Sequence, residues 1–128
     1  MNGRIIFTKN APTPGGHYAQ AIVHNGLLYL SGQLPIDPVS GKIVLGDLAQ
    51  IDQVFRNMES ILEEANSDWG NVLKLSIFLV KKDLWIPVNH KCQQVFGSHT
   101  PARTIVPEVG LKDGVMIEAD LIATVATS

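Results

Sequence analysis

Arg103 is the first residue whose type and position suggest chemistry. It follows Thr100-Pro101-Ala102, so a proline stiffens the chain just before it, at the start of a predicted strand. The planar guanidinium group can give a carboxylate two parallel, charge-assisted hydrogen bonds, which a lysine cannot match. This position is suitable for binding a small carboxylate ligand. From spacing alone, however, a solvated surface arginine or an ion pair with Glu108 or Glu118 is the favoured explanation.

Glu118 and Asp120 form the second candidate pair. They lie two residues apart on a predicted strand, so both side chains leave the same face. A carboxylate in a partly dry cleft can have its pKa raised and act as a general acid or base. A polar sheet edge or an intersubunit salt bridge is the alternative, and for Glu118 it is the favoured one.

Tyr18 and Ser31-Gly32 mark two loops that could enclose a small ligand. Tyr18 follows Gly15-Gly16-His17, and Ser31-Gly32-Gln33 ends a predicted strand. Glycines let a ligand approach backbone N–H groups closely, and a nearby tyrosine can cap a small pocket. Ordinary turn chemistry also accounts for both segments.

The sequence gives little support to metal or nucleophilic chemistry. His17, His24, His90 and His99 form no pair at metal-ligand spacing. Cys92, the single cysteine, falls inside a predicted helix, where a thiol usually packs as a small hydrophobe. Phosphate-binding glycine loops and the serine-hydrolase elbow do not occur in the sequence. We therefore expect neither a metal nor an organic cofactor.

The elements that position these residues follow from periodicity. Asn25-Gly26 between the apolar runs 21–24 and 27–30 predicts a hairpin with a type I′ turn. Apolar residues from Leu48 to Leu62 step by three and four, which predicts a helix that Asp47 caps and that ends near Ala65. The remaining predicted elements are strands at 72–80, 103–106 and 115–125 and a helix at 83–96, with Leu73, Leu75, Ile77 and Leu79 alternating along the first of these strands.

The predicted order is β-β-β-α-β-α-β-β over one domain, 1–128. This order indicates an α+β fold with both helices on one face of the sheet. The chain is too short to cover the other face, so we expect self-association.

The composition limits the kinds of partner and location that the chain is suited to. The chain has 128 residues, 45% of them hydrophobic, and a formal charge of −2. A weakly acidic protein has no electrostatic reason to seek nucleic acid or anionic lipid. The single cysteine, the absence of a signal-peptide pattern and the lack of a long apolar run favour a cytoplasmic protein without membrane association.

Several segments together resemble the RidA/YjgF reactive-intermediate deaminases. They are Gly16-His17-Tyr18-Ala19-Gln20-Ala21, Leu30-Ser31-Gly32-Gln33-Leu34-Pro35, Val88-Asn89, Pro101-Ala102-Arg103 and Ile117-Glu118-Ala119-Asp120-Leu121-Ile122-Ala123. The resemblance runs from about Ile5 to Val125. It implies a chorismate-mutase-like fold, a homotrimer with clefts between subunits and no cofactor.

The resemblance also implies roles for individual residues. Arg103 would bind the substrate carboxylate, Asp120 would stand where the better-known deaminases carry a glutamate that holds the attacking water, and Ile105 would stand where many members have a cysteine. The remaining pocket residues would be Tyr18, Ser31, Gly32 and Asn89.

The implied reaction is hydrolysis of 2-aminoacrylate or 2-iminobutanoate to a 2-oxo acid and ammonia. A trimer that binds a 2-oxo acid without turnover is the alternative. An endoribonuclease or translation inhibitor ranks below both, because the sequence has no basic stripe and few aromatic residues.

Overall fold

The sheet grows from the hairpin predicted at Asn25-Gly26. In the computed structural model, which describes residues 3–126, Asn25 and Gly26 have φ angles of 52° and 76°, as a type I′ turn requires. The turn joins β2 (Ala21–His24) to β3 (Leu27–Gln33), and β1 (Arg4–Ile6) pairs with β2 in antiparallel register. The predicted hairpin is therefore confirmed.

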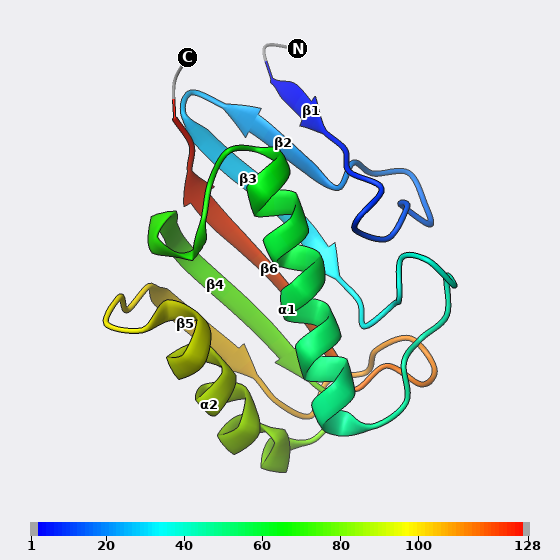
Figure 1. The fold of residues 1–128 in the computed structure, drawn as a ribbon. Coiled ribbons are helices and arrows are strands. Elements are labelled where there is room, and N and C mark those ends of the chain that lie inside the picture. Colours follow the sequence, from blue (N-terminus) through cyan, green and yellow to red (C-terminus); the bar gives the residue numbers. More distant parts are fainter. Residues whose placement is uncertain (1–2, 127–128) are drawn as a thin grey trace.

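The remaining elements follow in the predicted order (Figure 1). They are α1 (Asp47–Glu64), β4 (Val72–Leu79), α2 (Trp85–Phe96), β5 (Ala102–Val106) and β6 (Ile117–Thr124), with short 3-10 turns at Trp69–Asn71 and Lys82–Leu84. The sheet order is β1-β2-β3-β6-β4-β5. β5 pairs with β4 in parallel and the other pairings are antiparallel. The sheet is therefore mixed, with α2 as the crossover that parallel neighbours need.

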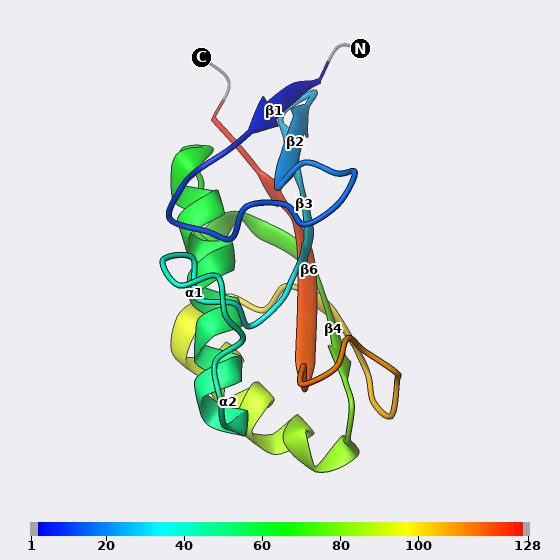
Figure 2. The same ribbon diagram turned by 90° about the vertical axis from the view of Figure 1, so that its right-hand side faces the viewer.

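Both helices pack on one face of the sheet (Figure 2). The core lies between them and the alternate residues of β3, β4 and β6. On β6, Ile117, Ala119 and Leu121 are buried in this core. The intervening residues point to the opposite face, which no helix covers. The predicted α+β architecture is confirmed.

Three local predictions were wrong. Asp47 is the first residue of α1 and makes no capping hydrogen bond; its carboxylate instead pairs with the Lys81 ammonium at 3.1 Å. Leu48, assigned to the apolar face of that helix, is 67% exposed. The alternation predicted along β4 fails at Leu73, which is 47% exposed, because a register irregularity against β6 falls between Val72 and Lys74.

Among the described residues, no helix combines the length and the apolar character that crossing a membrane requires.

Candidate active site

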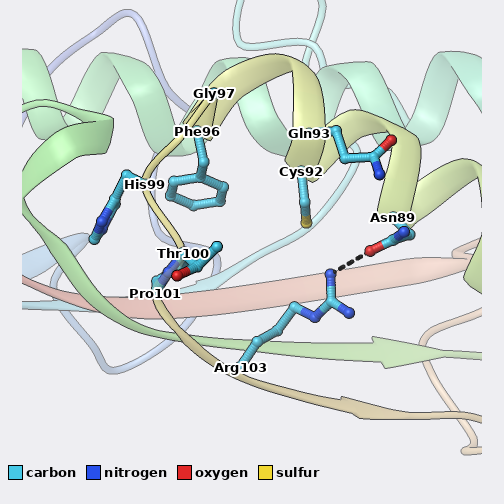
Figure 3. A pocket seen from close by; sticks show the side chains of 9 residues that line it. All are labelled: Asn89, Cys92, Gln93, Phe96, Gly97, His99, Thr100, Pro101 and Arg103. Carbon is cyan, nitrogen blue, oxygen red and sulfur yellow. Dashed lines mark hydrogen bonds between the residues drawn. The ribbon is translucent and has the colours of Figure 1, made fainter.

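Arg103 lies on β5, at the edge of the sheet, and its side chain enters a pocket on the helix side. β5 places Arg103 beside Leu75 of β4, whose own side chain belongs to the core. The pocket measures about 480 Å³ and lies between α2 and the segment that leads into β5 (Figure 3). Its lining residues are Asn89, Cys92, Gln93, Phe96, Gly97, His99, Thr100, Pro101 and Arg103.

The partners of the Arg103 guanidinium are uncharged. Its Nη1 donates a hydrogen bond of 2.8 Å to Asn89 Oδ1, and its Cζ lies 5.5 Å from the centre of the Trp85 ring. The ion pairs that residues 3–126 form are Lys81–Asp47 and Lys91–Asp52, so Arg103 pairs with neither Glu108 nor Glu118. The positive charge is therefore held in place without being neutralised.

The structure brings Asn89 to Arg103 through helix geometry. Trp85 lies four residues before Asn89 on α2, so the two share a face and meet the same guanidinium. Trp85 was not among the site residues predicted from the sequence. The i, i+4 spacing to Asn89 was the available signal, but it marks a site only once Arg103 is known to lie opposite.

Cys92 contributes a buried thiol to the same pocket. Its side chain is 7% exposed, and Figure 3 shows its sulfur pointing toward the Arg103 side of the cavity. Burial raises the pKa of the Cys92 thiol, while the neighbouring Arg103 lowers it, and burial is the larger effect. The thiol thus stays protonated near neutral pH and acts as a weakly polar wall, in line with the packing role expected from the sequence.

Tyr18 and Gly32 line a second, smaller hollow. It measures about 200 Å³ and includes Gln33 and Lys112. The Tyr18 hydroxyl accepts a 3.1 Å hydrogen bond from the Gly15 N–H, which holds the phenol against its own loop. The nearby Ser31 points elsewhere: its hydroxyl donates to Ala19 O at 2.6 Å and its N–H to Gln20 O at 2.9 Å. In this chain Ser31 therefore fixes the loop that carries Tyr18.

Glu118, for which a polar sheet edge or an intersubunit salt bridge was the favoured prediction, lies directly against Gly32. A Cβ built on Gly32 would overlap Glu118 Oε2 and would lie 3.1 Å from its Cδ. The close approach arises from a β-bulge between Leu30 and Gln33, where β3 gains one residue relative to β6. A side chain at this position would displace the Glu118 carboxylate, so glycine is what lets the two groups meet.

The two carboxylates of β6 both have raised pKa values. Both side chains leave the uncovered face and are half-buried there. Burial raises the pKa of Glu118, and the charge of Asp120 raises it further. Burial also raises the pKa of Asp120, with Lys74 opposing this shift. Such a pair exchanges a proton more readily near neutral pH than isolated carboxylates do.

The predicted site residues do not converge within one chain. Arg103 and Ile105 point to the helix side of β5, where Ile105 packs against the core. Asp120 and Glu118 leave the opposite face of β6. Tyr18 and Gly32 lie beyond β6, and β3 is three strands from β5, a distance of about 14 Å. One copy thus presents two separate surfaces that carry predicted site residues: the Arg103 pocket and the Tyr18–Gly32–Glu118 surface.

Within residues 3–126, no group of three or more His, Cys, Asp and Glu side chains is placed to hold a metal ion.

Comparison with known proteins assigns the chain to a family. The family model described as Endoribonuclease L-PSP, the YjgF/RidA family, matches residues 8–125. The human 2-iminobutanoate/2-iminopropanoate deaminase is 36% identical over 121 residues, which cover 94% of this chain and 88% of that protein.

Solved structures agree with this assignment. A Rid family protein of Yersinia pestis has a TM-score of 0.92 and 37% identity, covering 96% of this chain and 99% of its own. TdcF of Escherichia coli, solved with bound serine, has a TM-score of 0.89 and 27% identity, with coverages of 96% and 99%. The resemblance read from the sequence is therefore confirmed, and the chain belongs to the YjgF/RidA family.

Proposed function

We propose that this chain hydrolyses reactive 2-enamine and 2-imine acids to 2-oxo acids and ammonia. The observation that carries the proposal is the un-neutralised guanidinium of Arg103, held by Asn89 and Trp85 in a pocket. A cation kept among uncharged partners has its remaining donors available for a ligand carboxylate. The activity named for the human relative and the serine bound to TdcF support a small amino-acid-like substrate.

The proposed reaction needs only water and acid–base catalysis. The enamine acid 2-aminoacrylate takes a proton on its terminal carbon and loses one from nitrogen, giving the imine. Water adds to the imine carbon, and the tetrahedral adduct then expels ammonia and leaves the 2-oxo acid. Positioning of the substrate and one acid–base group, the latter contributing about 10²–10⁴-fold, is enough for such a labile substrate.

Glu118 is the better-placed acid–base group of the β6 pair. Its carboxylate lies against Gly32, which lines the same hollow as Tyr18, and both burial and Asp120 raise its pKa. Asp120 supports this shift by its charge, and it stays a candidate for holding the water itself. We assign the proton transfer to Glu118 and the tuning of its pKa to Asp120.

We propose further that the site is completed in a homotrimer. The Arg103 pocket of one copy would face the Tyr18–Gly32–Glu118 half-site of the next. Two different surfaces that meet head to tail form a closed ring when the rotation closes. The uncovered face of the sheet and the free edge of β5 provide the surface for such contacts.

A coupled assay tests the activity. A threonine or serine dehydratase generates the imine in situ, and formation of the 2-oxo acid is followed with and without the protein and with Arg103→Ala. Acceleration that the variant lacks supports the deaminase. Binding of 2-oxobutyrate that depends on Arg103, without any acceleration, selects the non-catalytic carboxylate-binding alternative instead.

Complementation tests the shared site. Arg103→Ala and Glu118→Gln proteins are inactive alone, but mixed assemblies formed by refolding them together in equal amounts contain clefts with both native residues. Random mixing makes that fraction about a quarter of all clefts, so about a quarter of native activity should return. No recovery, although mixed assemblies are shown to form, would contradict a site built from two copies.

A further inference from the structure

The hollow that Tyr18 and Gly32 line is enclosed by three separate segments of backbone, which we call its walls. Residues of 12–18 form the first wall, residues of 34–36 form the second, and the loop that carries Lys112 forms the third. Figure 1 shows these segments along one side of α1, as the loops before β2, after β3 and before β6. The lining residues of all three lie outside the helices and the main strands, so the ladder of the sheet does not hold them in place.

Buried amide side chains gather around this hollow. In the described part of the chain, the buried asparagine and glutamine side chains, all at most 4% exposed, are Gln20, Gln33, Gln50 and Asn57. A buried amide is costly unless it is hydrogen-bonded, and an apolar side chain of similar size packs without that cost. Gln33 bonds locally, to Ser31 O. The other three donate to backbone carbonyls of other segments, so their hydrogen bonds, rather than their packing, account for an amide at each position.

Gln20 holds the first wall, which carries Tyr18. Its Nε2 donates to Thr8 O at 2.9 Å, to Pro12 O at 3.0 Å and to Ala11 O at 3.4 Å. Its Oε1 accepts a hydrogen bond of 2.8 Å from the Thr8 N–H. The start of the loop that leads to Tyr18 is therefore fixed to a side chain that lies just beyond its end.

Asn57 holds the second wall from α1. Its Nδ2 donates to Leu34 O and to Ile36 O, both at 3.0 Å. Its Oδ1 accepts a hydrogen bond of 2.9 Å from Gln53 Nε2, one turn earlier on the helix, which orients the amide. The second wall begins directly after the bulge that contains Gly32. Asn57 therefore fixes the chain at the point where β3 ends.

Gln50 holds the third wall, also from α1. Its Nε2 donates to Gly114 O at 2.8 Å, at the end of the loop that carries Lys112. Its Oε1 accepts a hydrogen bond of 2.7 Å from the Met116 N–H, which lies two residues before Glu118. Gln50 therefore fixes both the end of this loop and the start of the strand that carries Glu118.

We propose that these three amides are positioning residues: each holds one wall of the hollow, so that the Tyr18–Gly32–Glu118 surface is in place before a substrate binds. This inference rests on the deaminase proposed above and adds residues that act through Tyr18 and Glu118. A misplacement of about 1 Å, even from a change far from the chemistry, can lower the rate by about 10²-fold. Arg103 lies outside the three walls, so the amides should affect turnover more than substrate binding.

Leucine variants test the inference in the dehydratase-coupled assay. Gln20→Leu, Gln50→Leu and Asn57→Leu keep a side chain of similar size and remove the hydrogen bonds. Each should lower kcat by about 10–100-fold. KM should stay within about two-fold of the parent value, because Arg103 is unchanged. Native kcat in the folded variants would overturn the inference.

Leu62→Ala is the stability control. Leu62 is buried in the core on α1, and its truncation destabilises the fold through a cavity without removing a hydrogen bond to any wall. Its kcat should stay native. If Leu62→Ala lowers kcat as much as the amide variants do, their loss is general destabilisation and the inference fails.

Hydrogen exchange followed by NMR locates the effect. Each leucine variant should speed backbone exchange about ten-fold in the wall that its own amide holds, at 9–18, 34–37 or 107–115, and leave the other two walls unchanged. A uniform increase, or none, would overturn the inference.

A milder variant covers the case in which a leucine variant does not fold. Gln53 is partly exposed, so Gln53→Leu removes the hydrogen bond to Asn57 and leaves the core intact. It should lower kcat by about two- to ten-fold and speed exchange at 34–37. Native kcat in this variant would overturn the inference.

The outcomes also separate this inference from the proposed function. If the parent protein and the amide variants hydrolyse imines equally well, the deaminase stands and the inference fails. If the parent hydrolyses no imine, the deaminase fails, and exchange decides. Increases confined to the wall of each amide would then support the three amides as the residues that position the hollow, and their absence would overturn the inference.

Discussion

Replacing Arg103 with lysine separates charge from geometry at the proposed site. The guanidinium donates to Asn89 Oδ1 through Nη1 at 2.8 Å, which leaves its other N–H groups to form a pair of hydrogen bonds with a carboxylate. A lysine ammonium in the same place keeps the charge, but its donors point apart, so it cannot give a carboxylate the two parallel hydrogen bonds that the planar guanidinium gives. It would therefore lose one of the two hydrogen bonds to the substrate.

The expected loss follows from the strength of that bond. A hydrogen bond to a charged group contributes about 1.5–3 kcal/mol. Since each 1.4 kcal/mol is a factor of ten, Arg103→Lys should lower kcat/KM by about 10–150-fold. Arg103→Ala removes both bonds and the charge, and should lower it by about 10²–10⁴-fold.

The dehydratase-coupled assay measures both variants. Arg56→Lys, an exposed change on the outer side of α1, is the matched control and should keep native activity. Circular dichroism and the oligomeric state check that each variant folds and assembles. If folded, assembled Arg103→Lys retains native kcat/KM, then Arg103 does not bind the substrate carboxylate as a two-point partner.

Two further predictions concern the charges around the site. Asn89→Asp places a carboxylate beside the Arg103 guanidinium, so the protein neutralises its own cation; we expect KM for the imine to rise by about ten-fold or more, and an unchanged KM would show that this guanidinium does not meet the substrate. Glu118→Gln removes a carboxyl group whose pKa is higher in the folded state than in the unfolded state. Such a group stabilises the folded state at a pH below its unfolded-state pKa, and this stabilisation is lost as the pH rises through its folded-state pKa. The variant should therefore have the same free energy of unfolding as the parent in acid and be more stable at neutral pH, by at most about 1 kcal/mol after solvent screening, while losing deaminase activity. Urea unfolding at several pH values measures the stability. A loss of stability at neutral pH would contradict the raised pKa.

Local chemistry made most of the fold predictable. The Asn25-Gly26 turn, the three-and-four spacing of α1 and the alternation along β6 are each set by a few neighbouring residues. The wrong predictions for Leu48 and Leu73 have their causes in tertiary structure. Leu48 lies in the first turn of α1 and is exposed although its spacing fits the apolar face, and Leu73 is displaced by an irregularity against β6. Both positions depend on contacts between separate segments, which the sequence of a single segment does not specify.

A candidate site residue could be predicted where its own chemistry identifies it, but not where the register between strands determines its neighbours. Arg103 and Asn89 were identified before the structure showed their hydrogen bond. The choice between Glu118 and Asp120 was not accessible in the same way, because alternation puts both on one face. The bulge in β3 adds one residue opposite β6 and brings Gly32 under Glu118. A shift of one residue in register thus places Glu118, and not Asp120, against Gly32.

In the proposed trimer, a small mixed sheet can carry the two halves of a site on separate surfaces and still use both. β5 is an edge strand, so its outer N–H and C=O groups need a cover, and the sheet face that carries Glu118 needs one too. In the proposed trimer, a neighbouring copy that covers these surfaces would also bring its Tyr18–Gly32–Glu118 surface to Arg103. Assembly and substrate binding then depend on the same contact. The proposed site also explains why the partners of Arg103 are uncharged, because a carboxylate supplied within the chain would occupy the position proposed for the substrate carboxylate.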